Sequence, residues 1–188
     1  MDICIPSIDD WQLNTMTNHK EKADTNITDL PKVTIYTDGG CINNPGPGGY
    51  GVVLLYKNHR KELSGGFRRT TNNRMEILAA IKGLEALHQR CRVTIYSDSQ
   101  YVVNAIEKGW ALRWQSNRWQ RNRKEKAVNP DLWERLLELC DSHDVRFRWI
   151  RGHRGTIENE RADQLAKGAA TGSDQSIDTI YENQSSQE

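Results

Sequence analysis

Two acidic residues of this sequence stand where a carboxylate could do chemistry. Asp38 and Asp98 each close a strand-like run, VTIYTD and VTIYSD. An Asp beside Gly39 and Gly40 is ordinarily a turn residue that hydrogen-bonds its own backbone. Ligand crevices of α/β sheets lie beyond strand ends, however, and two carboxylates there repel each other unless a cation lies between them. Oxygen ligands of this kind favour Mg2+ or Mn2+ over zinc.

Three further residues have both an ordinary and a chemical interpretation. Glu76 falls in the first turn of the helical pattern TTNNRMEILAAIKGLEALHQ, where complementing the helix dipole is a sufficient reason for it. Asp163 lies in ENERADQLAKGAA, where a solvated helix face accounts for it on composition alone. His153 follows the strand-like VRFRWI in a glycine-flanked loop, so it is either exposed or a proton shuttle near a metal site.

Four blocks, in this order and spacing, resemble type 1 ribonuclease H: TDGGCINNPGPGGYG, RTTNNRMEILAAI, YSDSQYV and RGHRGTIENERAD. The resemblance covers residues 32–170 and implies that His153 is the mobile loop histidine. It also implies an acidic metal-binding quartet of Asp38, Glu76, Asp98 and Asp163. Two departures occur: Gly40 stands where many relatives have Ser, and GTIENE lacks a His-Pro pair common in bacterial members. The second departure leaves the motion of the His153 loop open.

The activity implied by the resemblance is endonucleolytic hydrolysis of the RNA strand of RNA/DNA hybrids, leaving 3′-hydroxyl and 5′-phosphate ends. Two Mg2+ or Mn2+ ions about 3.5–4 Å apart, present with substrate bound, would activate a water and stabilise the leaving oxygen. The family arrangement implies that Asp38 bridges the ions and Asp163 lies on the water side. Glu76 and Asp98 would then lie on the leaving-group side. No Ser or Cys nucleophile is required.

Telling RNA from DNA depends on the 2′-hydroxyl, which short amides can contact as both donors and acceptors. The hybrid-contacting residues that the resemblance carries over are Asn44, Asn72 and Gln100. We expect backbone groups of Cys41 and Met75 to contribute as well. Asn73 is equally well a loop or cap residue and a contact. Thr71 and Asn129 resemble the family's pocket for a phosphate of the DNA strand.

The stretch EKGWALRWQSNRWQRNRKEKAVNPDLW interleaves tryptophans with basic residues. Such a charge run is usually a solvated face, and tryptophans four residues apart usually pack a helix. Interleaved, they predict a basic handle that grips a phosphate backbone, similar to that of bacterial-type family members. Trp110 and Trp114 either pack or line the DNA-strand channel. The basic residues expected to contact phosphates are Arg118, Arg121, Arg123, Lys124 and Lys126.

The expected fold class is α/β, a ribonuclease H-like mixed sheet of about five strands flanked by helices, with a basic handle helix and loop. The first three strands should form an antiparallel meander, and RVTIYSD and VRFRWI should extend the sheet. We expect a disordered or loosely docked extension over 1–31, a catalytic domain over 32–170 and a flexible tail over 171–188.

Composition is that of a single compact domain, with 188 residues and a net charge of +1. The four cysteines are scattered without CxxC spacing, which favours reduced thiols over zinc or disulfides. No apolar run reaches membrane-span length, and the N-terminal residues resemble neither a secretory signal nor a transit peptide. We therefore expect a cytoplasmic monomer with no membrane partner.

Two other functions are compatible with parts of this pattern. A transposase-like two-metal DNA enzyme could use the same fold, but the asparagine-rich loops and the position of Glu76 speak against it. A non-enzymatic hybrid-binding module should have lost at least one of the four carboxylates. All four are present.

Overall fold

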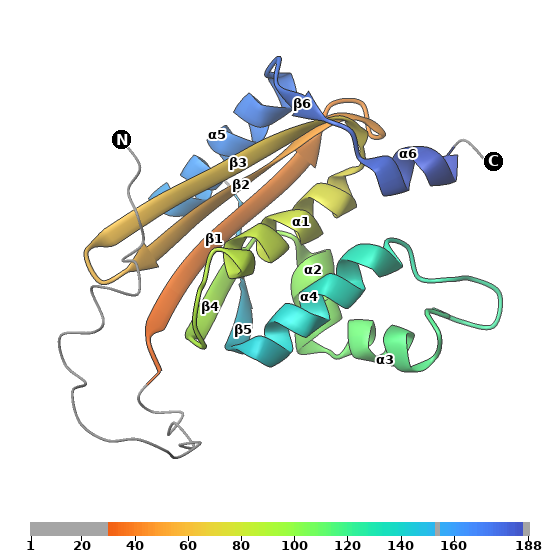
Figure 1. The fold of residues 1–188 in the computed structure, drawn as a ribbon, viewed down its shortest axis with the longest axis horizontal. Helices are drawn as coiled ribbons and strands as arrows, with labels where there is room; N and C mark the ends of the chain where they lie inside the picture. The colour runs from red at the N-terminus through yellow and green to blue at the C-terminus, as the bar shows by residue number, and fades with distance from the viewer. Residues whose placement is uncertain (1–29, 153–154, 186–188) are drawn as a thin grey trace.

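The structure, a computed structural model, describes residues 30–152 and 155–185 (Figure 1). Of the expected N-terminal extension only residues 30 and 31 are described, so its disorder or docking lies outside the described residues, as does His153. Within the described part, no helix is both long and apolar enough to span a membrane.

One mixed sheet forms the centre of the described chain, with the strand order β5-β4-β1-β2-β3-β6. The strands are β1 (Lys32–Cys41), β2 (Gly46–Tyr56), β3 (His59–Thr70), β4 (Arg92–Ser97), β5 (Asp144–Trp149) and β6 (Gln175–Ser176). β1, β2 and β3 form the antiparallel meander, while β4 is parallel to both β1 and β5. The predicted α/β sheet is confirmed, and the short β6 is a sixth strand that the sequence did not suggest.

Helices cover both faces of this sheet, with α5 behind it and α1, α2 and α4 in front in the view of Figure 1. The helices are α1 (Asn72–Glu85), α2 (Gln100–Glu107), α3 (Trp110–Ser116), α4 (Pro130–Ser142), α5 (Ile157–Thr171) and α6 (Thr179–Ser185). The short α3 and the loop that joins it to α4 project away from the sheet and form the predicted handle (Figure 1).

The core follows from strand alternation. Val33 and Ile35 of β1 are buried and lie in parallel register beside Val93 and Ile95 of β4. Together with apolar side chains of α1 and α4, they form one cluster on the front face of the sheet. Burying each such side chain contributes about 1.5–3 kcal/mol, so this cluster fixes β1 next to β4.

Glycines let two helices approach the end of β1 closely. A Cβ on Gly39 would overlap the backbone of Met75 and Glu76 in α1. On the opposite face, a Cβ on Gly51 would overlap the backbone of Ala162 in α5. Because Gly51 pairs with Asp38 across β1 and β2, both helices come close to that carboxylate.

The C-terminal segment differs from the expected flexible tail. β6 pairs with β3 at Gly66 and Phe67, and α6 follows it. Asp178, between these elements, is buried and forms an ion pair with the buried Arg74 of α1. Composition shows only that this segment is polar, whereas its docking depends on a partner about a hundred residues earlier in the chain.

Candidate functional site

The parallel pairing of β1 and β4 places Asp38 and Asp98 at one edge of the sheet. Thr37 lies opposite Ser97 in this register, and each aspartate is the next residue of its strand run. The backbone carbonyl of Asp98 accepts a hydrogen bond from Trp149 Nε1 at 3.0 Å, which ties this edge to β5. The sequence-based expectation that the two acids share a site agrees with this register.

The N-terminal part of α1 brings in Glu76, which is the fifth residue of the helix and lies just past the first turn, not within it as the sequence suggested. Thr71 caps the helix, and its hydroxyl accepts a hydrogen bond from the backbone N–H of Arg74. The Ser99 hydroxyl donates a short hydrogen bond to the Glu76 carboxylate. Burial, aided by the charge of Asp98, raises the pKa of Glu76 to about 7, although the Ser99 hydrogen bond opposes the shift.

Asp163, from α5, completes the group from the other face of the sheet. Burial, together with the charges of Asp98 and Asp163, raises the pKa of Asp38 to about 7, although a 2.7 Å hydrogen bond from the Gly39 N–H opposes the shift. Asp163 also forms an ion pair with Lys167, one helical turn later, with an Nζ–Oδ2 distance of 2.7 Å. The structure therefore brings Glu76 and Asp163 to the edge that holds Asp38 and Asp98, so that the four predicted carboxylates lie together.

These carboxylates suit a divalent cation in their chemistry. Clustered, partly buried carboxylates repel, and a hard cation would offset that repulsion with the oxygen ligands it prefers. Over residues 30–152 and 155–185, however, no three acidic, His or Cys side chains are already arranged to hold an ion. Lys167 contacts Oδ2 of Asp163 and Ser99 contacts Oε2 of Glu76, so an ion would either share these two carboxylates with their present partners or replace those partners.

The amides expected to contact a hybrid lie beside the carboxylates. Asn44 Oδ1 accepts a hydrogen bond from the backbone N–H of Asn72 at 3.2 Å, which joins the β1–β2 loop to the start of α1. Gln100 is exposed and begins α2, two residues after Asp98. Asn73 is also exposed. Asn44, Asn73 and Gln100 are thus exposed to a ligand, and Asn72 is half-buried.

Cys41 and Met75 were expected to contribute backbone groups, and their side chains are otherwise occupied. The Cys41 Sγ lies 3.1 Å from the carbonyl oxygen of Gly46 and 3.2 Å from that of Thr70, so its single S–H donates to one of them or is shared between the two. The Met75 side chain is fully buried. Only the backbone of these two residues remains for a substrate.

Thr71 and Asn129 are linked through Arg74, a residue that the sequence-based interpretation did not single out. Arg74 donates from Nη1 to Asn129 Oδ1 at 3.4 Å and forms ion pairs with Asp131 and Asp178. Burial opposes the charge of Arg74, but the hydrogen bonds to the two aspartates outweigh it and raise its pKa. The predicted phosphate pocket therefore adjoins a buried ionic network.

The handle carries the predicted basic residues on its surface. Those that are exposed are Arg118, Arg121, Arg123, Lys124 and Lys126. Trp114 instead faces inward, with its ring 5.9 Å from Trp133 and 6.4 Å from Tyr101. Trp110 is half-buried beside Trp114. Packing thus accounts for Trp114, while the exposed part of Trp110 remains accessible.

Besides Arg74, three residues that make polar contacts in or beside the site were not identified from the sequence. Ser99 carries the signal of a helix N-cap directly after Asp98, and it caps α2 as well as binding Glu76. Lys167 lies four residues after Asp163, the spacing of a helical ion pair. Asp178 carries no local signal, because its partner Arg74 is remote in sequence.

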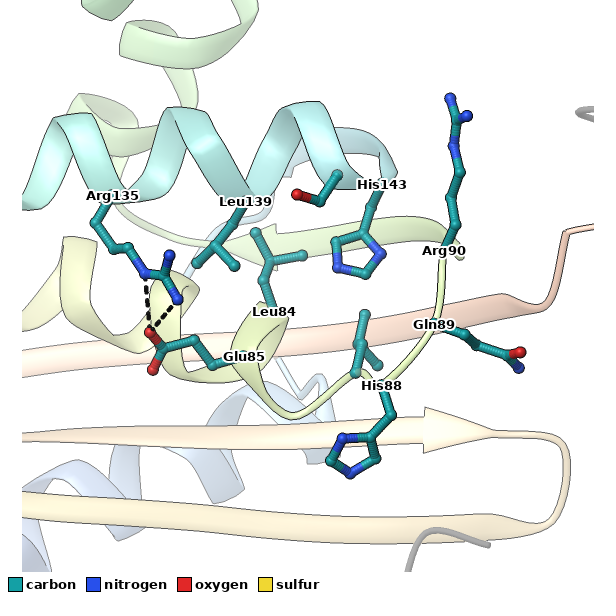
Figure 2. Close-up of a pocket in the computed structure, with 10 residues that line it drawn as sticks. Leu84, Glu85, His88, Gln89, Arg90, Arg135, Leu139 and His143 are labelled. Atoms are coloured by element: carbon teal, nitrogen blue, oxygen red, sulfur yellow. Dashed lines mark hydrogen bonds and ion pairs between the residues drawn. The ribbon is translucent and has the colours of Figure 1, made fainter. Parts of the chain in front are cut away.

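A separate pocket lies where α1 and α4 end, beside the start of β4 (Figure 2). Its walls include Leu84, Leu139 and His143, and the Arg135–Glu85 ion pair closes one side. His143 Nδ1 accepts a hydrogen bond from the backbone N–H of Cys91 at 3.2 Å, a structural contact. This pocket is at the opposite end of β4 from Asp98 and holds none of the predicted site residues.

Comparison with known proteins agrees with this arrangement. The RNase H family model matches residues 31–171. Ribonuclease H of Syntrophus aciditrophicus is 69% identical over 150 residues, covering 80% of this chain and 87% of that protein. LC9-RNase H1, a type 1 RNase H with the type 2 active-site motif, superposes with a TM-score of 0.67 at 32% identity, covering 83% of this chain and 81% of the other.

A further solved structure includes a nucleic acid. LC11-RNase H1, in complex with an RNA/DNA hybrid, superposes with a TM-score of 0.57 at 25% identity, covering 73% of this chain and 96% of the other. The four sequence blocks, the sheet order and these matches agree with one another. The chain belongs to the ribonuclease H family and is a type 1 ribonuclease H.

Proposed function

We propose that this ribonuclease H is an endonuclease that hydrolyses the RNA strand of RNA/DNA hybrids by a two-metal-ion mechanism, leaving 3′-hydroxyl and 5′-phosphate ends. The observation that carries the proposal is the gathering of four carboxylates at one sheet edge, where the pKa of both Asp38 and Glu76 is raised to about 7. Such a cluster costs folding free energy that bound cations would offset, and carboxylates with pKa values shifted in this way are typical of functional sites.

The metal-binding residues in this proposal are Asp38, Glu76, Asp98 and Asp163. When bound, two Mg2+ ions, or Mn2+, would supply an activated water and stabilise the leaving oxygen. Lys167 holds the carboxylate of Asp163 in the metal-free protein through its ion pair. His153, outside the described residues, remains our candidate for moving a proton at the loop.

Recognition of the hybrid is assigned to groups around the carboxylates. Asn44, Asn72 and Gln100 can donate to and accept from a 2′-hydroxyl, with Asn73 and the backbone of Cys41 and Met75 beside them. Thr71 and Asn129 would hold a phosphate of the DNA strand, and the basic handle would add phosphate contacts farther along. The complex of LC11-RNase H1 with a hybrid supports a substrate of this kind. We further propose a cytoplasmic monomer.

The direct test is incubation with end-labelled RNA/DNA hybrid, duplex DNA and single-stranded RNA, with and without Mg2+. We expect internal cleavage of the RNA in the hybrid alone, only with the metal, and product ends that a ligase requiring 3′-hydroxyl and 5′-phosphate termini can rejoin. Cleavage of duplex DNA at a comparable rate would favour the transposase-like alternative, and metal-dependent binding without cleavage would favour a hybrid-binding module.

Mg2+ affinity should depend on pH through the same carboxylates. Because the pKa of Asp38 and of Glu76 is about 7 in the metal-free protein, both are mostly protonated at about pH 6 and mostly ionised at about pH 8. A proton must leave before either ligates a cation, so apparent affinity should fall about tenfold for each carboxylate as the pH is lowered between these values.

Isothermal titration in buffers of different ionisation enthalpy measures both the affinity and the protons released. We expect proton release on Mg2+ binding near neutral pH, and less of it in an Asp38→Asn variant. Mg2+ binding that is independent of pH and releases no protons would show that these carboxylates are not ligands.

A further inference from the structure

We propose that Asp178, in the C-terminal segment, is a positioning residue for the DNA-strand phosphate: acting through Arg74, it fixes the Asn129 amide with Nδ2 ready to donate to a phosphate oxygen. The proposal rests on the proposed function, because it assumes that Asn129 and Thr71 receive a phosphate. It gives a role in substrate binding to a segment that lies beyond the residues matched by the family model.

The first step is that hydrogen bonds occupy the N–H donors of the Arg74 guanidinium. Its side chain is only 3% exposed. Nε and Nη2 donate to the two carboxylate oxygens of Asp178 at 2.7 and 2.9 Å. Nη1 and Nη2 donate to the two oxygens of Asp131 at 3.1 and 2.9 Å. Because the guanidinium is planar and bidentate on two sides, its orientation is fully determined.

The second step is the orientation of Asn129. Its Oδ1 accepts the remaining Arg74 hydrogen bond from Nη1 at 3.4 Å. Arg74 can only donate, so this hydrogen bond selects the amide orientation in which Nδ2 points away from the guanidinium. Nδ2 is buried and has no acceptor among the described residues. A buried donor left unpaired costs about 1–3 kcal/mol, which an incoming phosphate oxygen would recover.

The third step is the anchoring of Asp178 itself. Its carboxylate also accepts hydrogen bonds from the Thr70 hydroxyl at 2.8 Å and from the backbone N–H of Tyr181. Thr70 precedes Thr71, the helix cap whose hydroxyl accepts from the Arg74 backbone N–H. Asp178 therefore contacts both sides of the pocket, the residue before Thr71 directly and Asn129 through Arg74.

Removing the charge of Asp178 leaves Arg74 with one anionic partner, Asp131. The guanidinium would then be held firmly on one side only, and the constraint on the Asn129 amide would be released. We expect Asp178→Asn, which keeps the size of the side chain, to weaken one phosphate interaction selectively rather than all of them.

The experiment uses hybrids in which single DNA-strand phosphates are replaced by neutral methylphosphonates. For wild type, the substitution at the linkage held by Asn129 should raise KM about tenfold, the value of one charge-assisted hydrogen bond. In Asp178→Asn that penalty should shrink to about twofold, while penalties at linkages contacted by the handle stay unchanged and kcat stays within twofold. A role in folding alone would leave the ratio between linkages unchanged.

The matched control is Glu182→Gln, which breaks the exposed Arg68–Glu182 ion pair of the same segment without touching Arg74. It should keep the wild-type linkage profile. Asp178→Glu, which keeps the charge but displaces the carboxylate, serves as a second variant if Asp178→Asn does not fold, and should show the same selective loss. An unchanged profile in the folded Asp178 variants overturns the inference alone, and a wild-type chain that cleaves no hybrid overturns the proposed function.

Discussion

Asp98→Asn should lower kcat on an RNA/DNA hybrid by at least about a thousandfold while hybrid affinity stays within a few-fold. The substitution removes the charge that would hold a cation but preserves the shape of the side chain. That matters because the space beside Asp98 is tight: a Cβ on Gly152 would meet its carboxylate. The backbone carbonyl of Asp98 would still accept the hydrogen bond from Trp149, so the sheet edge should keep its structure.

A matched control is Asp144→Asn. Asp144 begins β5, at the opposite end of the β4–β5 pair from Asp98, and its carboxylate forms an ion pair with Arg92. Turnover should stay close to wild type in this variant. The measurements are single-turnover cleavage rates and hybrid affinities in Ca2+, with melting temperatures to verify folding. Near-normal turnover of a folded Asp98→Asn protein would remove Asp98 from the metal site.

Neutralising the handle should weaken hybrid binding without changing the chemical step. The five residues changed to Ala are Arg118, Arg121, Arg123, Lys124 and Lys126. For every phosphate that the handle no longer neutralises, the slope of log affinity against log salt should become shallower by about 0.7–0.9. KM at low salt should therefore rise by orders of magnitude if all five bind phosphates, whereas kcat at saturating hybrid should change little because the carboxylates are untouched.

KM measured across a salt series for wild type and the five-residue variant tests this. Lys32→Ala combined with Arg90→Ala serves as the control, because both residues are exposed at the other end of the sheet. This control should retain the wild-type salt slope. If the five-residue variant also retains it, the basic run is only a solvated face.

The strands, the principal helices and the edge that holds Asp38 and Asp98 were all predictable from the sequence. Alternation in β1 and β4 identifies their buried faces, and the register of parallel neighbours then places the two aspartates together. The resemblance supplied Glu76 and Asp163, for which local patterning had sufficient ordinary explanations. These features depend on periodicity or on motifs that are contiguous in the chain.

Contacts between remote segments were not predictable. Asp178 lies in a polar segment without periodicity, and its burial depends on Arg74. The sequence also left the roles of Trp110 and Trp114 open, because spacing alone does not show which side of a short helix faces the core. The spacing of Asp163 and Lys167 is compatible with a helical ion pair, but the sequence does not show that Ser99 donates to Glu76, because that contact joins two separate helices.

The glycines at the end of β1 also limit how this enzyme can be engineered. Replacing a glycine in a strand with a β-branched residue is a common way to strengthen a sheet. At Gly39 or Gly51 the added Cβ would push α1 or α5 away from the sheet, and Glu76 or Asp163 would move with its helix. These two positions act as spacers that set how far apart the carboxylates stand. A library that seeks thermostability should leave both unchanged, because any gain in strand propensity there would come with a displaced carboxylate.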